Sequence, residues 1–146
     1  MPELPEVETV RRGLQPAMEG ARIAAVDLRR ADLRFPFQPD FAARLAGQRI
    51  LGLGRRAKYL MADLASGDVL MMHLGMSGSF RVGNLPIGEF HHPRNDELVH
   101  DHVVLKMANG TTVTYNDPRR FGFMKVVARA ALDGEPLLKG LGPEPL

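Results

Sequence analysis

The stretch KYLMADLASGDVLMMHL, residues 58–74, decides the fold class of this chain. Two apolar-rich runs, Lys58–Leu64 and Val69–Leu74, flank the turn-forming residues Ala65-Ser66-Gly67-Asp68. Strand-forming runs on either side of a short turn that contains Gly and Asp are typical of a β-hairpin. We therefore expect two antiparallel strands here.

The sequence around this hairpin predicts more strands. Ala24, Val26 and Leu28 alternate with other residues, as in a strand with one buried face. Asn109-Gly110 is a strong hairpin turn, whereas residues 84–97, with two Pro and mixed charge, indicate a loop. The further strands that we expect are Arg22–Arg30, Arg49–Leu53, Ser77–Val82, His102–Met107, Thr111–Tyr115 and Phe123–Ala128.

Two helices are also expected. The first begins at Pro5-Glu6-Val7-Glu8, because Pro suits the first helical position and acidic residues oppose the helix dipole. Its apolar face is Val7, Val10 and Leu14, and Pro16 is expected to end it. The second is a short helix capped by Asp40, running through Phe41 and Leu45 to Gly47. The fold class is therefore α+β and mainly β: a two-layer antiparallel β-sandwich with flanking helices, one of them N-terminal.

Composition narrows the functional classes. The chain has 146 residues, enough for about one domain, and a net charge of +2 with 15 Arg against 4 Lys. The absence of cysteine excludes disulfides, thiolate zinc sites and a Cys nucleophile. No apolar run approaches the length of about 18 residues that spans a bilayer, and the first residues do not form a secretory signal. We expect a cytoplasmic protein with no membrane association.

The tail from residue 133 to residue 146 is rich in Gly and Pro, as linkers are. We expect residues 1–132 to form one domain and residues 133–146 to lead to a further part of a longer protein.

The N-terminus holds the first candidate site. If Met1 is removed, Pro2 presents a secondary amine, which forms an iminium with an aldehyde-like carbon. Glu3 and Glu6 lie close enough in sequence to handle protons. The alternative is an ordinary helix start with acidic residues in its first turn.

The second candidate is Arg55-Arg56-Ala57-Lys58-Tyr59, whose three cations suit phosphates. Strand alternation would place Arg56 and Lys58 on one face. The alternative is a charged edge strand that discourages aggregation.

Two further turns hold candidate DNA-contacting residues. Met76 lies in a turn where an exposed, unbranched side chain suits an apolar wedge between bases; the alternative is a core Met. Arg119 and Phe121 lie in a turn where Arg contacts a base edge and Phe stacks; the alternative is a Phe that packs inward.

Four of the five histidines, His91, His92, His100 and His102, lie within twelve residues. His100 and His102 would share one strand face, which suits metal ligation. We favour contact with phosphate or a carboxylate over a metal, and expect no metal site and no cofactor in this chain.

Five motifs occur in order: MPELPEVETVRRGL, RRAKYL, HLGMSGSF, HDHV and DPRRFG. Together they resemble the N-terminal domain of bacterial formamidopyrimidine-DNA glycosylases, over nearly the whole chain. The resemblance implies base-excision repair by a bifunctional DNA glycosylase and abasic-site lyase. It would remove oxidised purines (8-oxoguanine and formamidopyrimidines) with β,δ-elimination, acting on damaged double-stranded DNA as a monomer in the bacterial nucleoid.

The resemblance also implies a role for each matching residue. Pro2 matches the nucleophile that attacks C1′ through a Schiff base, Glu3 the proton donor at the sugar and Glu6 a supporting carboxylate. Lys58 matches the lysine of proton transfer in the elimination. The DNA contacts that match are the phosphate-binding His73 and His100, and the trio Met76, Arg119 and Phe121, which fills the gap left by the flipped base.

One departure bears on activity. The family continues into a helical DNA-binding domain and a four-Cys zinc finger, and this chain has neither. The resemblance therefore implies reduced activity for this chain. The alternative function is a non-catalytic DNA-binding or scaffold module of the same fold.

Overall fold

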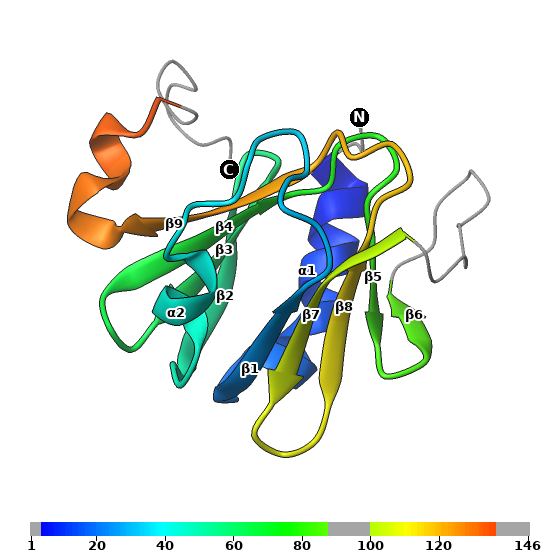
Figure 1. Cartoon of the computed structure of the whole chain (residues 1–146), viewed down its shortest axis with the longest axis horizontal. Coiled ribbons are helices and arrows are strands. Elements are labelled where there is room, and N and C mark those ends of the chain that lie inside the picture. Colours follow the sequence, from blue (N-terminus) through cyan, green and yellow to red (C-terminus); the bar gives the residue numbers. More distant parts are fainter. Residues whose placement is uncertain (1–3, 88–99, 137–146) are drawn as a thin grey trace.

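The structure is a computed structural model, and it describes residues 4–87 and 100–136. Its strands form two antiparallel sheets that share one hydrophobic core (Figure 1). The five-stranded sheet has the order β1-β7-β8-β5-β6 and the four-stranded sheet the order β2-β3-β4-β9. The bounds are β1 Ile23–Leu28, β2 Ile50–Arg56, β3 Tyr59–Leu64, β4 Asp68–His73, β5 Ser79–Val82, β6 Leu85–Ile87, β7 Asp101–Met107, β8 Thr112–Asn116 and β9 Phe123–Ala128. The predicted fold class, mainly β with an N-terminal helix, is confirmed.

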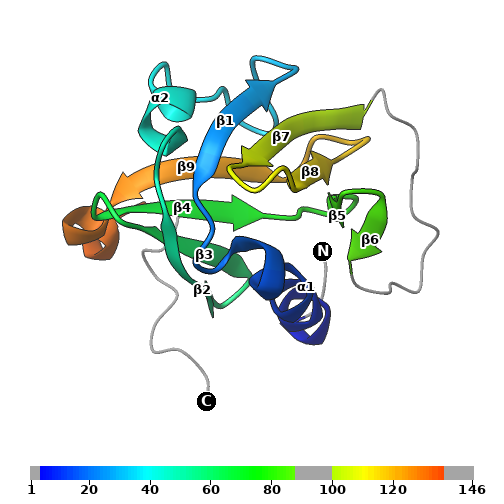
Figure 2. The ribbon, with the colours of Figure 1, turned by 90° about the horizontal axis from the view of Figure 1, so that it is seen from below.

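Helices close the two open sides between the sheets. The N-terminal helix α1, Leu4–Met18, contacts β2 at the edge of one sheet and β5 and β6 at the edge of the other (Figures 1 and 2). The short helix α2, Phe41–Leu45, contacts the opposite edge strands, β1 and β9. Each helix therefore covers a sheet edge and contributes apolar side chains to the common core.

The predicted helical face of α1 is confirmed, because Val7, Val10 and Leu14 are fully buried. The predicted end at Pro16 is wrong, since the helix continues to Met18. Pro16 lies in the last turn, and Met18 is completely buried in the core. The burial of this side chain accounts for the extra turn beyond the proline.

The hairpins form as predicted. Register pairs β3 with β4 around a turn in which Gly67 has a positive φ of 94°, and β7 with β8 around Gly110 at 92°. The predicted ends of β9 agree with the structure, and the other predicted strand ends differ from it by at most three residues. The largest difference is in β2, which extends through Arg56.

Three local predictions are wrong. Ala24 is exposed because a bulge between Ile23 and Ala25 interrupts the alternation of β1. Part of the predicted loop is strand β6, where Ile87 packs against Gly13 of α1. The Asp40 side chain makes no capping hydrogen bond; its carboxylate lies 3.9 Å from Arg44.

After β9 the chain forms a 3₁₀-helix, η2, over Arg129–Gly134. Glu135 follows with its carboxylate buried and 2.9 Å from the Lys125 ammonium. Residues 137–146 of the predicted linker lie outside the described residues. Across the described parts of the chain, no helix has the length and apolar character that a membrane span requires.

Candidate functional site

The site lies at one end of the four-stranded sheet. Register places the pairs Arg56–Tyr59 and His73–Phe123 at this end. The β2–β3 turn, the β4–β5 loop and the β8–β9 loop all leave the strands here (Figure 1). Antiparallel pairing therefore brings together three of the motifs found in the sequence.

Lys58 lies in the tight turn between β2 and β3. The prediction that Arg56 and Lys58 share a strand face is wrong, because Arg56 ends β2 and Lys58 lies beyond its last pair. Ala57 has a φ of 52°, which residues other than Gly rarely adopt. The Arg55 guanidinium donates to the Ala57 carbonyl at 2.9 Å. The turn presents Lys58 at the end of the hairpin rather than on a sheet face.

His73 is buried at the end of β4. Its ring stacks parallel to Phe123, with centroids 5.3 Å apart, and lies 5.2 Å from Tyr59. Burial, together with the smaller effects of the cations Arg34 and Lys58, lowers the pKa of His73 to about 4. The ring is therefore neutral at pH 7. Because Nδ1 accepts from the Gly75 amide at 3.0 Å, the proton is on Nε2, where it can donate to an anion.

Met76, Arg119 and Phe121 come together from two loops. Met76 and Phe121 are about half exposed, at 48% and 49%. The Arg119 guanidinium lies 3.7 Å from the Met76 sulfur and 5.8 Å from the Phe121 ring centroid. Two exposed apolar side chains with an arginine between them form a projecting cluster of the kind that enters a base stack.

Asp117, which is completely buried, supports this cluster from below. One of its carboxylate oxygens accepts from the Ser77 hydroxyl at 2.6 Å and from the Arg120 amide at 3.0 Å. The other accepts from the Tyr115 hydroxyl and the Gly122 amide, both at 2.9 Å. Burial raises the pKa of Tyr115 well above its usual range, so its hydroxyl stays protonated as a donor. Asp117 therefore fixes both loops.

A cavity of about 520 Å³ opens beside the cluster. Its lining residues are Leu33, Arg34, Met76, Arg119, Arg120 and Phe121. The Arg34 amide donates to the Gly122 carbonyl at 3.0 Å, which ties the segment before α2 to the β8–β9 loop. Sequence reasoning missed Arg34 and Asp117. An Asp before Pro at the start of a turn was a usable signal for the second, while nothing singled out the first.

Of the remaining predicted site residues, some are described by the structure and others are not. Glu6 lies in the first turn of α1 and is partly exposed, and His100 precedes β7 with its ring 6.2 Å from His102. The His102 Nε2 donates to the Asp117 carbonyl at 2.8 Å. Within residues 4–87 and 100–136, no three His, Asp or Glu side chains gather closely enough to hold a metal ion. The other predicted residues, Pro2, Glu3, His91 and His92, lie outside the described residues.

Comparison with known proteins identifies the family. The family model described as the formamidopyrimidine-DNA glycosylase N-terminal domain matches residues 1–124. The chain belongs to the formamidopyrimidine-DNA glycosylase family. The predicted resemblance is confirmed, and the described site residues Lys58, His73, Met76, Arg119 and Phe121 fall within the part of the chain that the family model covers.

The formamidopyrimidine-DNA glycosylase of Rhodopseudomonas palustris (strain HaA2) is 73% identical over 150 residues, and that of Bradyrhizobium diazoefficiens is 70% identical. Each match covers 100% of this chain and 51% of the relative, so the chain spans about half the length of these relatives. A crystal structure of a complex between Lactococcus lactis Fpg and abasic-site DNA superposes with a TM-score of 0.80 at 32% identity. This match covers 99% of the chain and 51% of the Lactococcus lactis protein.

Proposed function

We propose that this chain is the catalytic domain of a bifunctional DNA glycosylase and abasic-site lyase that removes oxidised purines from duplex DNA. The observation that carries the proposal is the cluster of Met76, Arg119 and Phe121, which lies at the same end of the four-stranded sheet as Lys58 and the neutral His73. A base must leave the stack before C1′ can be attacked, and side chains must fill the space that it leaves.

The chemistry that we assign begins at Pro2, once Met1 is removed. Its secondary amine attacks C1′ as the bond from C1′ to the damaged base breaks, and the base leaves with that electron pair and takes up the proton that the proline nitrogen gives up. The nitrogen electron pair then forms the double bond to C1′ as the C1′–O4′ bond breaks and O4′ takes a proton. Glu3 supplies this proton, and Glu6 supports the site. The product is an iminium at C1′, a cation that withdraws electrons from C2′.

Elimination follows from the iminium. A proton leaves C2′, its electron pair becomes a carbon–carbon double bond towards C3′, and the 3′ phosphate departs with the C3′–O electrons. We assign this proton transfer to Lys58, in the β2–β3 turn. His73 and His100 contact phosphates, and a second, δ-elimination releases the sugar remnant.

The geometry supports placing the amine and Lys58 at the same end of the molecule. The Leu53 amide donates to Glu19 at 2.9 Å, while Arg55, two residues further along β2, reaches Glu8 at 3.3 Å. α1 therefore runs antiparallel to β2, and its N-terminal turn points in the direction of the β2–β3 turn. Leu4, where α1 begins, lies about 6 Å along the helix axis beyond Glu8.

The test is reduction with borohydride while the chain is mixed with duplex DNA that contains an abasic site. We expect a covalent adduct that maps to Pro2 by peptide mass, and mass spectrometry of the protein gives the state of Met1. The adduct disappears when the terminus is acetylated or Met1 is retained. An adduct that survives a blocked terminus, or that maps to Lys58, contradicts the nucleophile. DNA binding without any adduct favours the non-catalytic module.

A further inference from the structure

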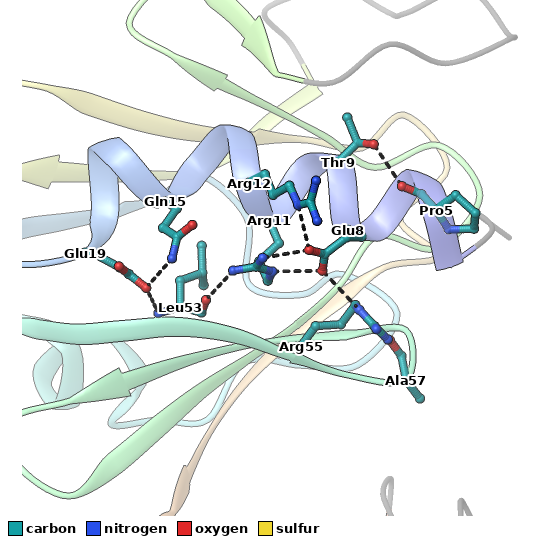
Figure 3. A network of polar contacts seen from close by, with 10 residues as sticks. All are labelled: Pro5, Glu8, Thr9, Arg11, Arg12, Gln15, Glu19, Leu53, Arg55 and Ala57. Atoms are coloured by element: carbon teal, nitrogen blue, oxygen red, sulfur yellow. Dashed lines mark hydrogen bonds and ion pairs between the residues drawn. The ribbon is translucent and has the colours of Figure 1, made fainter. Parts of the chain in front are cut away.

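One carboxylate, Glu8, joins α1 to the β2–β3 hairpin (Figure 3). Its oxygens accept from Arg11 at 2.6 Å, from Arg12 at 3.0 Å and from Arg55 at 3.3 Å. The hydrogen bond from Arg11 is the largest of the effects that lower the pKa of Glu8 to about 2. Glu8 is therefore ionised at neutral pH and offers a fixed negative charge to the hairpin.

A second nitrogen of the Arg55 guanidinium forms a hydrogen bond with the β2–β3 turn. While Nε contacts Glu8, Nη1 donates to the Ala57 carbonyl at 2.9 Å (Figure 3). This carbonyl belongs to the peptide group that leads into Lys58. The planar guanidinium can satisfy two acceptors at fixed angles, which a lysine ammonium on its flexible stem cannot reproduce.

The turn needs such a restraint. Ala57 has φ of 52°, an unfavourable conformation for a residue with a Cβ, and the pairing of β2 with β3 stops at Arg56 and Tyr59. The hydrogen bond to the Ala57 carbonyl fixes the orientation of the peptide between Ala57 and Lys58. The direction in which Lys58 leaves the hairpin therefore depends on Arg55.

Further hydrogen bonds join α1, which carries Glu8, to β2, which carries Arg55. The Leu53 carbonyl accepts from Arg11 at 3.2 Å and the Leu53 amide donates to Glu19 at 2.9 Å. β2 is an edge strand, and these contacts use backbone groups that no neighbouring strand takes. Glu8 thus holds Arg55 relative to a helix that is hydrogen-bonded to the same strand.

We infer that Arg55, held by Glu8, is a positioning residue that sets Lys58 relative to the first turn of α1. The inference rests on the proposed function, in which Lys58 transfers the proton in the elimination and Pro2 precedes α1. A positioning role differs from simple stabilisation of the fold, because it acts on elimination more than on formation of the iminium.

The experiment compares Arg55→Lys and Glu8→Gln with the parent 146-residue chain on duplex abasic-site DNA. Two rates are measured: formation of the borohydride-trapped adduct and cleavage of the strand. We expect the ratio of cleavage to trapping to fall at least tenfold in both variants. Arg12→Ala is the matched control, because Arg12 contacts the same carboxylate from a side chain that is 74% exposed. We expect its ratio to stay within twofold of the parent.

A second measurement needs no activity. The backbone order parameter of the Lys58 amide, from ¹⁵N relaxation, should fall from about 0.85 to below about 0.6 in Arg55→Lys and Glu8→Gln. Arg12→Ala should leave it unchanged. An unchanged order parameter, or an equal loss of trapping and cleavage, overturns the inference. A parent chain that traps no adduct contradicts the proposed function instead, and the order parameter still decides whether Arg55 positions the turn.

Discussion

The Ser77 hydroxyl lies 2.6 Å from a carboxylate oxygen of the buried Asp117, and this hydrogen bond joins the two loops that carry the projecting cluster. The Ser77 oxygen also accepts from the Arg119 amide at 3.1 Å. One serine therefore connects the backbone of the β8–β9 loop to the carboxylate beneath it.

Replacing Ser77 with alanine should destabilise the protein without creating a cavity in the hydrophobic core. In Ser77→Ala the Asp117 oxygen keeps its bond from the Arg120 amide but loses the hydroxyl. A hydrogen bond to a charged, buried group is worth about 1.5–3 kcal/mol, so we expect a loss of that size in the free energy of unfolding, measured with urea. Ser66→Ala is the control, because Ser66 lies in the exposed β3–β4 turn. A control that loses as much as Ser77→Ala would show that the bond between the loops contributes nothing.

Two glycines with similar positive φ angles allow the cost of a steric clash to be compared with the cost of backbone strain. Gly75 has φ of 63° and Gly83 has φ of 58°. A Cβ on Gly75 would lie 2.5 Å from the Gly122 amide nitrogen, whereas a Cβ on Gly83 would meet nothing within 4 Å. We expect Gly83→Ala to cost about 1–2 kcal/mol, the strain of a left-handed residue. Gly75→Ala should cost several kcal/mol more, because backbone must move. Equal unfolding midpoints for the two variants would contradict the close approach of the loops.

The hairpins could be predicted because a turn signal such as Asn109-Gly110 is local and needs no knowledge of the partner strand. The exposure of Ala24 could not, because it follows from a bulge in the pairing of β1 with β7, distant in sequence. The prediction that Lys58 lies on a strand face was wrong for a related reason. Alternation extended the strand through Arg56-Ala57-Lys58, whereas the hairpin turns at Ala57.

The candidate site also contains residues that the sequence could predict and residues that it could not. Short sequence motifs locate Met76, between Gly75 and Gly78, and Arg119 and Phe121, before Gly122. The support beneath them depends on Asp117, which is buried because strands from both sheets end around it. An Asp in a turn motif is usually exposed, so burial of this kind becomes visible only when the sheets are assembled.

The stability of the protein should fall on mild acidification. His73 has a pKa of about 4 in the folded chain, lowered first by burial, against a usual value of 6.5. Between these pH values the unfolded chain binds more protons, so stability is complete above about pH 6.5 and is lost towards pH 4. Burial also lowers the pKa of His102, which acts in the same direction.

The variant His73→Asn tests this assignment, because an Asn oxygen can still accept from the Gly75 amide. We expect the slope of unfolding free energy against pH between 4 and 6.5 to decrease by up to about 1.4 kcal/mol per pH unit. The carboxylate of Glu8, with a pKa of about 2 against 4.5, acts only in the more acidic window between those values. An unchanged slope in His73→Asn would mean that His73 titrates normally in the fold.

The last prediction concerns the projecting cluster and compares duplex with single-stranded DNA. Arg119 contacts both Met76 and Phe121 at the surface, and the proposed function uses the three side chains to fill the space left by a flipped nucleotide. Only a duplex has such a space. Truncation to Ala should therefore slow cleavage at an abasic site in duplex DNA more than in single-stranded DNA.

Contacts of a side chain with unstacked bases are worth about 1–3 kcal/mol each, so each single variant should reduce the duplex rate roughly 5- to 150-fold relative to the single-stranded rate. Leu85→Ala is the matched control, since Leu85 is an apolar side chain 66% exposed in the strand β6, away from the two loops. Its ratio of duplex to single-stranded cleavage should equal that of the parent. If Met76→Ala, Arg119→Ala and Phe121→Ala slow both substrates equally, the cluster binds DNA only as a general surface, and the wedge assignment is wrong.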